Sequence, residues 1–212
     1  MKKIFTIMAL LLILQHHVSA QVTFGVSAGI ISANYAAKES GVRMSPSRKT
    51  GFTVGSFVNV PIAGSLYFQP GLNFVQKGYV FKDNSDPAYA EKNTNTVNCI
   101  EIPLNMVYRT NGNSNGFMFG VGPSLAFAVS GKDKYESAAT KETTKLKIGN
   151  GIDDDLRGFD LGGNIIAGVQ LKSRIVFAAN YNFGFSNLIP KGDSDTRLTS
   201  NYFGVRVGYV FK

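Results

Sequence analysis

The sequence predicts an all-β protein, an eight-stranded antiparallel up-and-down transmembrane β-barrel with short periplasmic turns and long extracellular loops. Three observations predict it. Apolar residues alternate with small or polar ones in eight blocks, the breaks between blocks alternate in length, and the second face of the blocks carries little charge. Because neighbouring side chains of a strand point to opposite faces, each block has one apolar side. An even strand number with long loops on one side is typical of outer-membrane barrels.

The last block, residues 201–212, shows the pattern most clearly. Its apolar face carries Phe203, Val205, Val207, Tyr209 and Phe211, whereas the opposite face is mainly glycine with the single charge of Arg206. A soluble barrel such as a lipocalin would show charged residues on that second face. Four of the eight blocks have no charge in their spanning part. We therefore expect lipid outside the barrel and a narrow polar interior.

The first four blocks are residues 22–36, 51–60, 65–81 and 96–109. The first two carry no charge and place Thr, Ser, Gly and Asn opposite their apolar faces. The third and fourth add amide and charged side chains to the second face, among them Lys77, Glu101 and Arg109. These blocks therefore predict strands with one lipid-facing and one inward-facing side.

The next three blocks are residues 116–130, 159–171 and 174–186. In the first, Phe117 and Phe119 lie opposite Gly, Ser and Ala. The second alternates apolar residues with Asp160, Asn164 and Gln170, and the third alternates Tyr181 and Phe183 with Asn180 and Asn182. Each block again has the two-residue period of a strand.

The breaks between the blocks alternate between long and short. Short turns are predicted at residues 61–64, 111–115 and 172–173, where Gly, Asn, Pro and Ser are frequent. The longest break, residues 131–157, contains twelve charges that sum to zero. Pro70, Pro103 and Pro123 fall inside blocks, where a closed ladder leaves no free edge for them, so we expect β-bulges there.

Residues 1–20 have the form of an export signal, with Lys2 and Lys3 before an apolar run and small residues up to Ala20. This predicts a signal peptide at 1–20, a barrel domain at 21–212 and a protein of the Gram-negative cell envelope. Both histidines lie in the signal, so His-dependent catalysis and ordinary zinc sites are excluded. The single Cys99 excludes an internal disulfide and is expected to be inert in the lumen.

The precursor carries a net charge of +8, and removal of two lysines with the signal leaves +6. The cations are scattered through predicted loops, so no nucleic-acid surface is expected. We expect neither catalytic nor cofactor-binding nor metal-binding residues. Three consecutive aspartates, Asp153, Asp154 and Asp155, could hold calcium, but they lack the EF-hand spacing and are more simply a solvated turn.

The alternation predicts a polar network in the lumen. Its residues are Lys77, Glu101, Asn105, Arg109, Asp160, Asn164, Asn180 and Arg206. We expect Glu101 and Arg206 to form an ion pair, since a lone charge in that interior would be costly. The aromatic side chains expected to face lipid are Phe117, Phe119, Tyr181, Phe183, Tyr209 and Phe211.

Several stretches resemble motifs of the PorT-like outer-membrane β-barrel family. They are LYFQPGLNFVQKGYVF at residues 66–81, NCIEIPLNMVYR at residues 98–109 and GVGPSL at residues 120–125. The prolines within them coincide with prolines of the motifs. The resemblance implies an eight-stranded barrel in the outer membrane, in a family that includes secretion-system components and many barrels without an assigned role.

The sequence favours a non-enzymatic outer-membrane barrel with a filled lumen, which acts as a structural, adhesion or secretion-associated component through its extracellular loops. The alternatives are a narrow pore or transporter for small solutes and an enzyme that works without histidine. The expected partners are outer-membrane lipid, lipopolysaccharide, the barrel-insertion machinery and a secretion-system component. Tyr209 and Phe211 resemble the C-terminal signal that the insertion machinery reads. Both termini are expected to be periplasmic.

Overall fold

The computed structural model describes residues 22–39, 42–44, 46–83, 91–112, 115–137, 139–190, 192 and 196–211. The predicted signal peptide therefore lies outside the described residues. None of the described residues forms a helix long and apolar enough to cross a membrane.

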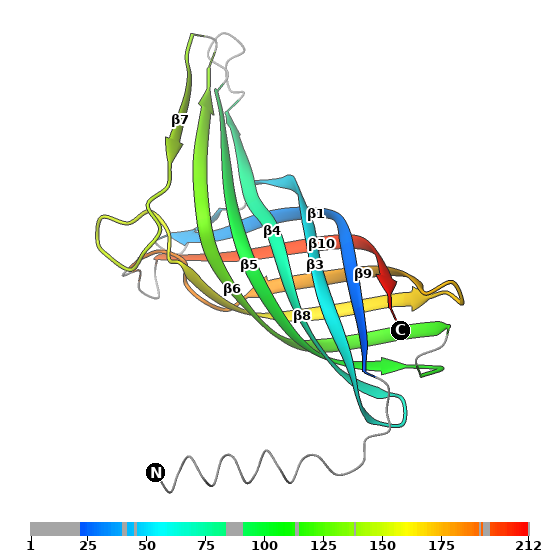
Figure 1. Ribbon diagram of the computed structural model, residues 1–212. Coiled ribbons are helices and arrows are strands. Elements are labelled where there is room, and N and C mark those ends of the chain that lie inside the picture. Colours follow the sequence, from blue (N-terminus) through cyan, green and yellow to red (C-terminus); the bar gives the residue numbers. More distant parts are fainter. Residues whose placement is uncertain are drawn as a thin grey trace, which may run out of the picture.

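Eight long strands form a closed antiparallel barrel (Figure 1). They are β1 (Thr23–Glu39), β3 (Ser47–Ala63), β4 (Leu66–Asp83), β5 (Glu91–Arg109), β6 (Gly116–Glu136), β8 (Phe159–Gln170), β9 (Ile175–Gly184) and β10 (Thr196–Val210). Each strand pairs with the next along the chain, and β10 pairs with β1 from Gly25↔Val210 to Glu39↔Thr196. The predicted eight-stranded up-and-down fold is confirmed, and closure leaves the barrel wall without an unpaired edge.

Two short strands lie outside the barrel wall. β2 (Val42–Met44) pairs with the end of β1, and β7 (Lys141–Lys145) pairs with the end of β6. The prediction that residues 131–157 are a loop throughout is therefore wrong. β6 continues to Glu136, and Thr and Tyr residues in this polar stretch suit paired strands despite the charges around them.

The ends of β4, β5, β6 and β7 form a sheet that continues past the barrel, which we call the extension. Within it Lys82 pairs with Lys92, Lys92 with Glu136, and Glu136 with Lys141. Figure 1 shows β7 and the paired strand ends standing clear of the other barrel strands. The three short turns lie at the opposite end of the barrel, where Gly64 and Gly112 adopt positive φ angles of 53° and 60°.

Side chains alternate between the interior and the outer surface along the barrel strands. On β6, Met118 is 3% exposed, whereas its neighbours Phe117 and Phe119 are 61% and 55% exposed. The outer surface of the wall is thus apolar and the interior holds most of the polar side chains. This is the reverse of a soluble barrel and is the arrangement that lipid surroundings require.

The expected β-bulges at Pro70, Pro103 and Pro123 are absent. Pro70 has no ladder partner on β3 but pairs with Leu104 on β5, and the register is the same on both sides of it. Pro103 and Pro123 likewise lack a partner on the preceding strand and pair with the following one. Each proline thus interrupts one ladder locally, because it lacks an N–H, without inserting an extra residue. The register shifts lie elsewhere, for example between Asn98 and Cys99.

Candidate functional site: the filled lumen and the extension

Polar side chains close the lumen near the short turns, in what we call the turn-side layer. Arg109 on β5 donates hydrogen bonds of 2.8 Å to Gln170 Oε1 on β8 and to Asn59 Oδ1 on β3. Gln69 Nε2 also donates to Asn59 Oδ1 at 2.7 Å, and Asn59 Nδ2 donates to Thr23 Oγ1 at 2.9 Å. All five residues are buried, so this hydrogen-bonded group links β1, β3, β4, β5 and β8 across the interior of the barrel.

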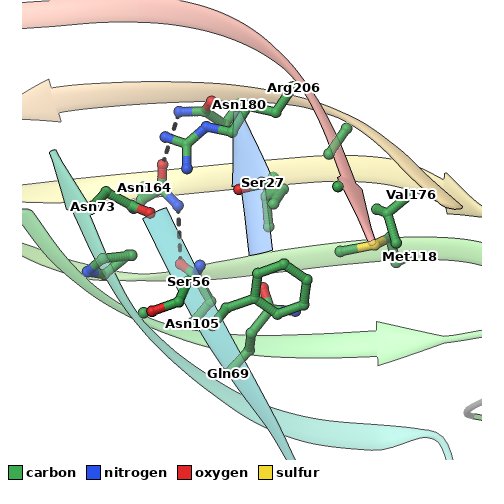
Figure 2. A pocket seen from close by; sticks show the side chains of 16 residues that line it. Ser27, Ser56, Gln69, Asn73, Asn105, Met118, Asn164, Val176, Asn180 and Arg206 are labelled. Carbon is green, nitrogen blue, oxygen red and sulfur yellow. Dashed lines mark hydrogen bonds between the residues drawn. The ribbon is translucent and has the colours of Figure 1, made fainter. Parts of the chain in front are cut away.

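A layer of asparagines lies at mid-height (Figure 2). Asn164 Nδ2 donates to Asn105 Oδ1 at 3.0 Å, and Asn180 Nδ2 donates to Asn164 Oδ1 at 3.4 Å, which joins β5, β8 and β9. Beside it lies a cavity of about 40 Å³ that Asn73 and Arg206 also line. A cavity of this volume, which polar and apolar side chains line together, has room for a small number of water molecules and is far below the size of a solute channel.

A charged layer lies on the loop side of the asparagines. Lys77 Nζ on β4 lies 3.3 Å from Glu101 Oε2 on β5, and both side chains are at most 2% exposed. Tyr202 on β10 donates a hydrogen bond of 2.6 Å to Glu101 Oε1, and Lys77 lies over the ring of Tyr202. Ser200 on β10 donates a hydrogen bond of 2.5 Å to Asp160 Oδ2 on β8. The buried charges are thus paired or hydrogen-bonded, as their burial requires.

The predicted ion pair between Glu101 and Arg206 is wrong. Arg206 Nη2 donates to Tyr202 Oη at 3.3 Å, so Tyr202 stands between the two charges. The ladder pairings can be followed from Glu101 to β10 in both directions around the barrel. Through β4, β3 and β1 they lead to Gly208. Through β6, β8 and β9, with the last two registers extended by a few residues, they lead to Leu198. Because barrel strands are tilted and staggered, the level of Glu101 lies midway between these two, beside Tyr202.

An apolar cluster closes the lumen above the charged layer. Tyr35, Val97, Cys99 and Ala126 from the wall pack against Leu156 and Leu188, which come from the segments after β7 and β9. Cys99 is a buried free thiol within this cluster. A space of about 10 Å³ lies among these residues, Lys77 and Asp160. Buried side chains therefore occupy the lumen at both ends, and a small cavity lies at mid-height.

The structure places the predicted interior residues as follows. Lys77, Glu101, Asn105, Arg109, Asp160, Asn164 and Asn180 are buried inside the barrel, and Arg206 is half-buried at the central cavity. They lie at successive levels: Arg109 in the turn-side layer, three asparagines at mid-height, and Lys77, Glu101 and Asp160 in the charged layer. Tyr202 and Asn59 are not among the interior hydrogen-bonding residues predicted from the sequence. Tyr202 lies on the same face of its block as Gly204 and Arg206, and Asn59 lies on the polar face of its block, so the alternation could have found both.

The six predicted lipid-facing aromatics lie on the outer surface. Phe117, Phe119, Tyr181, Tyr209 and Phe211 are 39% to 61% exposed, whereas Phe183 is half-buried. Phe183 is partly covered because it stacks on Tyr181, contacts Phe185 edge-on and lies over Gly163 of the neighbouring strand. A Cβ on Gly163 would come within 2.6 Å of the Phe183 ring, so a larger residue there would displace this aromatic from its present position.

The acidic turn after β7 is held by its own backbone. Asp154 Oδ2 accepts a hydrogen bond of 2.6 Å from Gly151 N, and Asp155 Oδ2 accepts one of 2.8 Å from Lys147 N. Across the part of the chain that the structure describes, no three Cys, His, Asp or Glu side chains gather in a way that could hold a metal ion.

One edge of the extension is open. β7 pairs with β6 on one side, and none of the described strands pairs with its other side. All five residues of β7 are exposed. An unpaired strand edge presents a row of N–H and C=O groups that can pair with an extended segment of another protein.

The family of outer membrane protein β-barrel domains matches residues 14–190. Among solved structures, the chain is similar to the attachment invasion locus protein Ail of Yersinia pestis, with 16% identity, a TM-score of 0.43 and coverage of 90% of this chain and 99% of Ail. Neisserial surface protein A matches at 13% identity and a TM-score of 0.40, covering 90% of this chain and 99% of that protein. The outer membrane protein OprG of Pseudomonas aeruginosa matches at 9% identity and a TM-score of 0.46, covering 89% of this chain and 95% of OprG.

These likenesses concern the fold alone. A search of curated proteins found no match. Since the family match covers most of the sequence, the chain belongs to the outer membrane protein β-barrel domain family and is an outer-membrane β-barrel protein.

Proposed function

We propose that the protein is a non-enzymatic surface component of the outer membrane, in which a filled barrel anchors a sheet that binds a protein partner. The observation that carries this proposal is the contrast between a sealed interior and an open extension. Residues of the turn-side layer, the charged layer and the apolar cluster occupy the lumen, whereas β7 offers a free strand edge outside it. The barrel then serves as an anchor and the extension as the binding element.

The proposed orientation places the three short turns and both termini in the periplasm and the extension outside the cell. Long connections on the outer side and short ones on the periplasmic side are the usual arrangement in such barrels. A secretion-complex component is the partner class that we favour, because the motif-like stretches at residues 66–81 and 98–109 resemble PorT-like barrels. Lipopolysaccharide and the insertion machinery are further partners in this proposal.

The competing function is a narrow pore for small solutes. The cavity beside Arg206, of about 40 Å³, is the feature that would serve it. A pore would require the turn-side layer and the apolar cluster to move aside, and each is held by buried contacts from several strands. We therefore expect no conduction.

Two measurements test the proposal. The purified barrel, reconstituted in planar bilayers, should give no discrete single-channel currents. The same protein, extracted from outer membranes in mild detergent, should bring down a defined protein partner, and a variant in which the open edge of β7 is blocked should lose it. Steady single-channel currents together with partner-free protein would overturn the proposal and support the pore.

A further inference from the structure

A row of hydrogen-bonded polar side chains marks where the outer surface of the barrel stops being apolar. Lys49 Nζ donates to Gln76 Oε1 at 3.3 Å, Gln76 Nε2 donates to Asn98 Oδ1 at 3.2 Å, and Asn98 Nδ2 donates to Ser130 Oγ at 2.9 Å. This row crosses β3, β4, β5 and β6. The outward residues below it, such as Phe74 and Phe127, are apolar. Amides and hydroxyls at this level suit the boundary between acyl chains and lipid headgroups.

Directly beyond this row, the same side of the extension is covered with lysines. Residues that oppose each other on neighbouring strands point to the same side of a sheet. Lys82, Lys92, Glu136 and Lys141 oppose one another in sequence across β4 to β7, and Lys132 opposes Lys145. Lys134 lies on the same side, two residues before Glu136. We call this surface the lysine face; its lysines are Lys82, Lys92, Lys132, Lys134, Lys141 and Lys145.

The charges of the extension are separated by face. Glu136 is the one acidic residue on the lysine face as described, with Lys134 Nζ at 2.8 Å and Lys92 Nζ at 3.8 Å. The hydrogen bond from Lys134 lowers the pKa of Glu136, with nearby Lys92 and Lys141 contributing. The opposite side of the sheet carries Asp133 and Glu142. A stretch of sequence whose charges sum to zero therefore folds into one strongly basic surface.

Two lysine pairs on this surface oppose each other directly. Lys82 lies opposite Lys92, and Lys132 lies opposite Lys145. Like charges in directly opposed positions destabilise a sheet. One glutamate offsets only part of this repulsion, whereas a multivalent anion on the lysine face would offset both pairs.

We propose that the lysine face binds the phosphate groups of lipopolysaccharide in the outer leaflet that surrounds the barrel. It continues the lipid-facing surface through the polar row, so it stands at the height of the lipid phosphates. Its charge is complementary to them, and each lysine near an anionic membrane surface contributes to attraction within a Debye length. The membrane holds lipid-bound phosphates beside this side of the extension, whereas a soluble anion has only the charge attraction. The inference rests on the proposed function for the outward orientation of the extension and for lipopolysaccharide as a partner, and it names the surface that binds it.

The test uses the refolded barrel in detergent micelles, titrated with bisphosphorylated lipid A and followed by native mass spectrometry. Two double variants each remove one opposed pair: Lys132→Gln with Lys145→Gln, and Lys82→Gln with Lys92→Gln. The matched control, Lys147→Gln with Lys172→Gln, removes two exposed lysines outside the lysine face. All these side chains are exposed, so folding is expected to be unaffected and is checked by circular dichroism.

Each pair variant should bind lipid A about tenfold or more weakly than the unaltered barrel, and the control should bind unchanged. Dephosphorylated lipid A should lose most of its affinity for the unaltered barrel, and inositol hexakisphosphate, a soluble phosphate, should bind more weakly than lipid A. Equal binding by pair variants and control overturns the inference, as does equal binding of dephosphorylated lipid A. Tighter binding of the soluble phosphate does so too, because the ligand would then not be the lipid. None of these results depends on bilayer currents or partner capture, which test the proposed function.

Discussion

Tyr202 and Glu101 are joined across the full width of the barrel, because β10 and β5 lie four strands apart in either direction around the wall and a hydrogen bond of 2.6 Å links the tyrosine hydroxyl to Oε1. The same carboxylate forms the ion pair with Lys77 on the neighbouring strand. A single buried glutamate thus links opposite walls of the barrel, and its removal should weaken the contacts of both Tyr202 and Lys77.

The first prediction concerns this ion pair. Glu101→Gln should destabilise the barrel by about 3–5 kcal/mol, because it leaves the Lys77 ammonium buried without a counter-charge. The double variant Glu101→Gln with Lys77→Met should recover much of that loss, since it removes both charges. Urea unfolding in detergent, followed by circular dichroism, measures these two variants and Lys77→Met alone. A double variant as unstable as the two single losses added together would show that the charges act independently.

The second prediction concerns the turn-side layer. Asn59 is fully buried and accepts hydrogen bonds from both Arg109 and Gln69. Asn59→Leu removes that acceptor and should cost about 2–5 kcal/mol in unfolding free energy, because a buried guanidinium group loses a partner. Asn59→Asp is the matched control: it keeps oxygen acceptors for both donors and should be less damaging. If Leu were tolerated as well as Asp, the layer would not contribute through these hydrogen bonds.

The third prediction concerns the open edge of β7. Leu146 N donates to Gly131 O and Ser137 N donates to Thr140 O, so by the alternation of an antiparallel ladder Thr144 is bonded to β6 and Thr143 faces the open edge. Thr143→Pro should leave the extension folded and abolish partner capture, because it removes an edge N–H. Thr144→Pro should instead disrupt the β6–β7 pairing, seen as faster amide exchange in β7. Partner capture unchanged by Thr143→Pro would exclude strand addition at this edge.

The fourth prediction concerns pH. Burial raises the pKa of Asp133 on the inner side of the extension, although a hydrogen bond from Asn95 opposes this and Asp155 adds to it. A carboxyl group whose pKa is raised on folding favours the folded state when protonated. Its contribution is therefore fully present below about pH 4, the ordinary aspartate pKa, and is lost as pH rises through the raised pKa.

Amide exchange rates in β6 and β7 are corrected for the intrinsic pH dependence of exchange. The corrected rates should be slower near pH 4 than above the raised pKa of Asp133, because the extension is more stable when Asp133 is protonated. Asp133→Asn removes the titrating group and should flatten that dependence. The same pH dependence in the Asn variant would assign the effect to another group.

The barrel could be predicted from the sequence because lipid imposes a two-residue period that local composition reveals directly. Phe117, Phe119 and Val121 alternate with Met118 and Gly120, and this alone fixes which side chains point inward. Partners across the lumen could not be predicted in the same way. They depend on the tilt and stagger of the strands, which place Tyr202 rather than Arg206 level with Glu101.

The extension was hidden for a different reason. Residues 131–157 look like a loop because their charges cancel in sequence and no apolar period marks strands there. Only pairing shows that Lys132 and Lys145 share one side of a sheet while Asp133 lies on the other. At the prolines, the sequence predicted an irregularity that the structure does not have. Pro103 lies in a continuous strand, because its missing N–H removes a ladder contact on one side only.

Because Tyr202 belongs to β10, its hydrogen bond to Glu101 cannot form until β10 has paired with β1 and β9. The Lys77–Glu101 ion pair, by contrast, joins the neighbouring strands β4 and β5 and needs only their pairing. β10 therefore both closes the barrel wall and supplies the hydroxyl that hydrogen-bonds to a carboxylate buried inside the barrel.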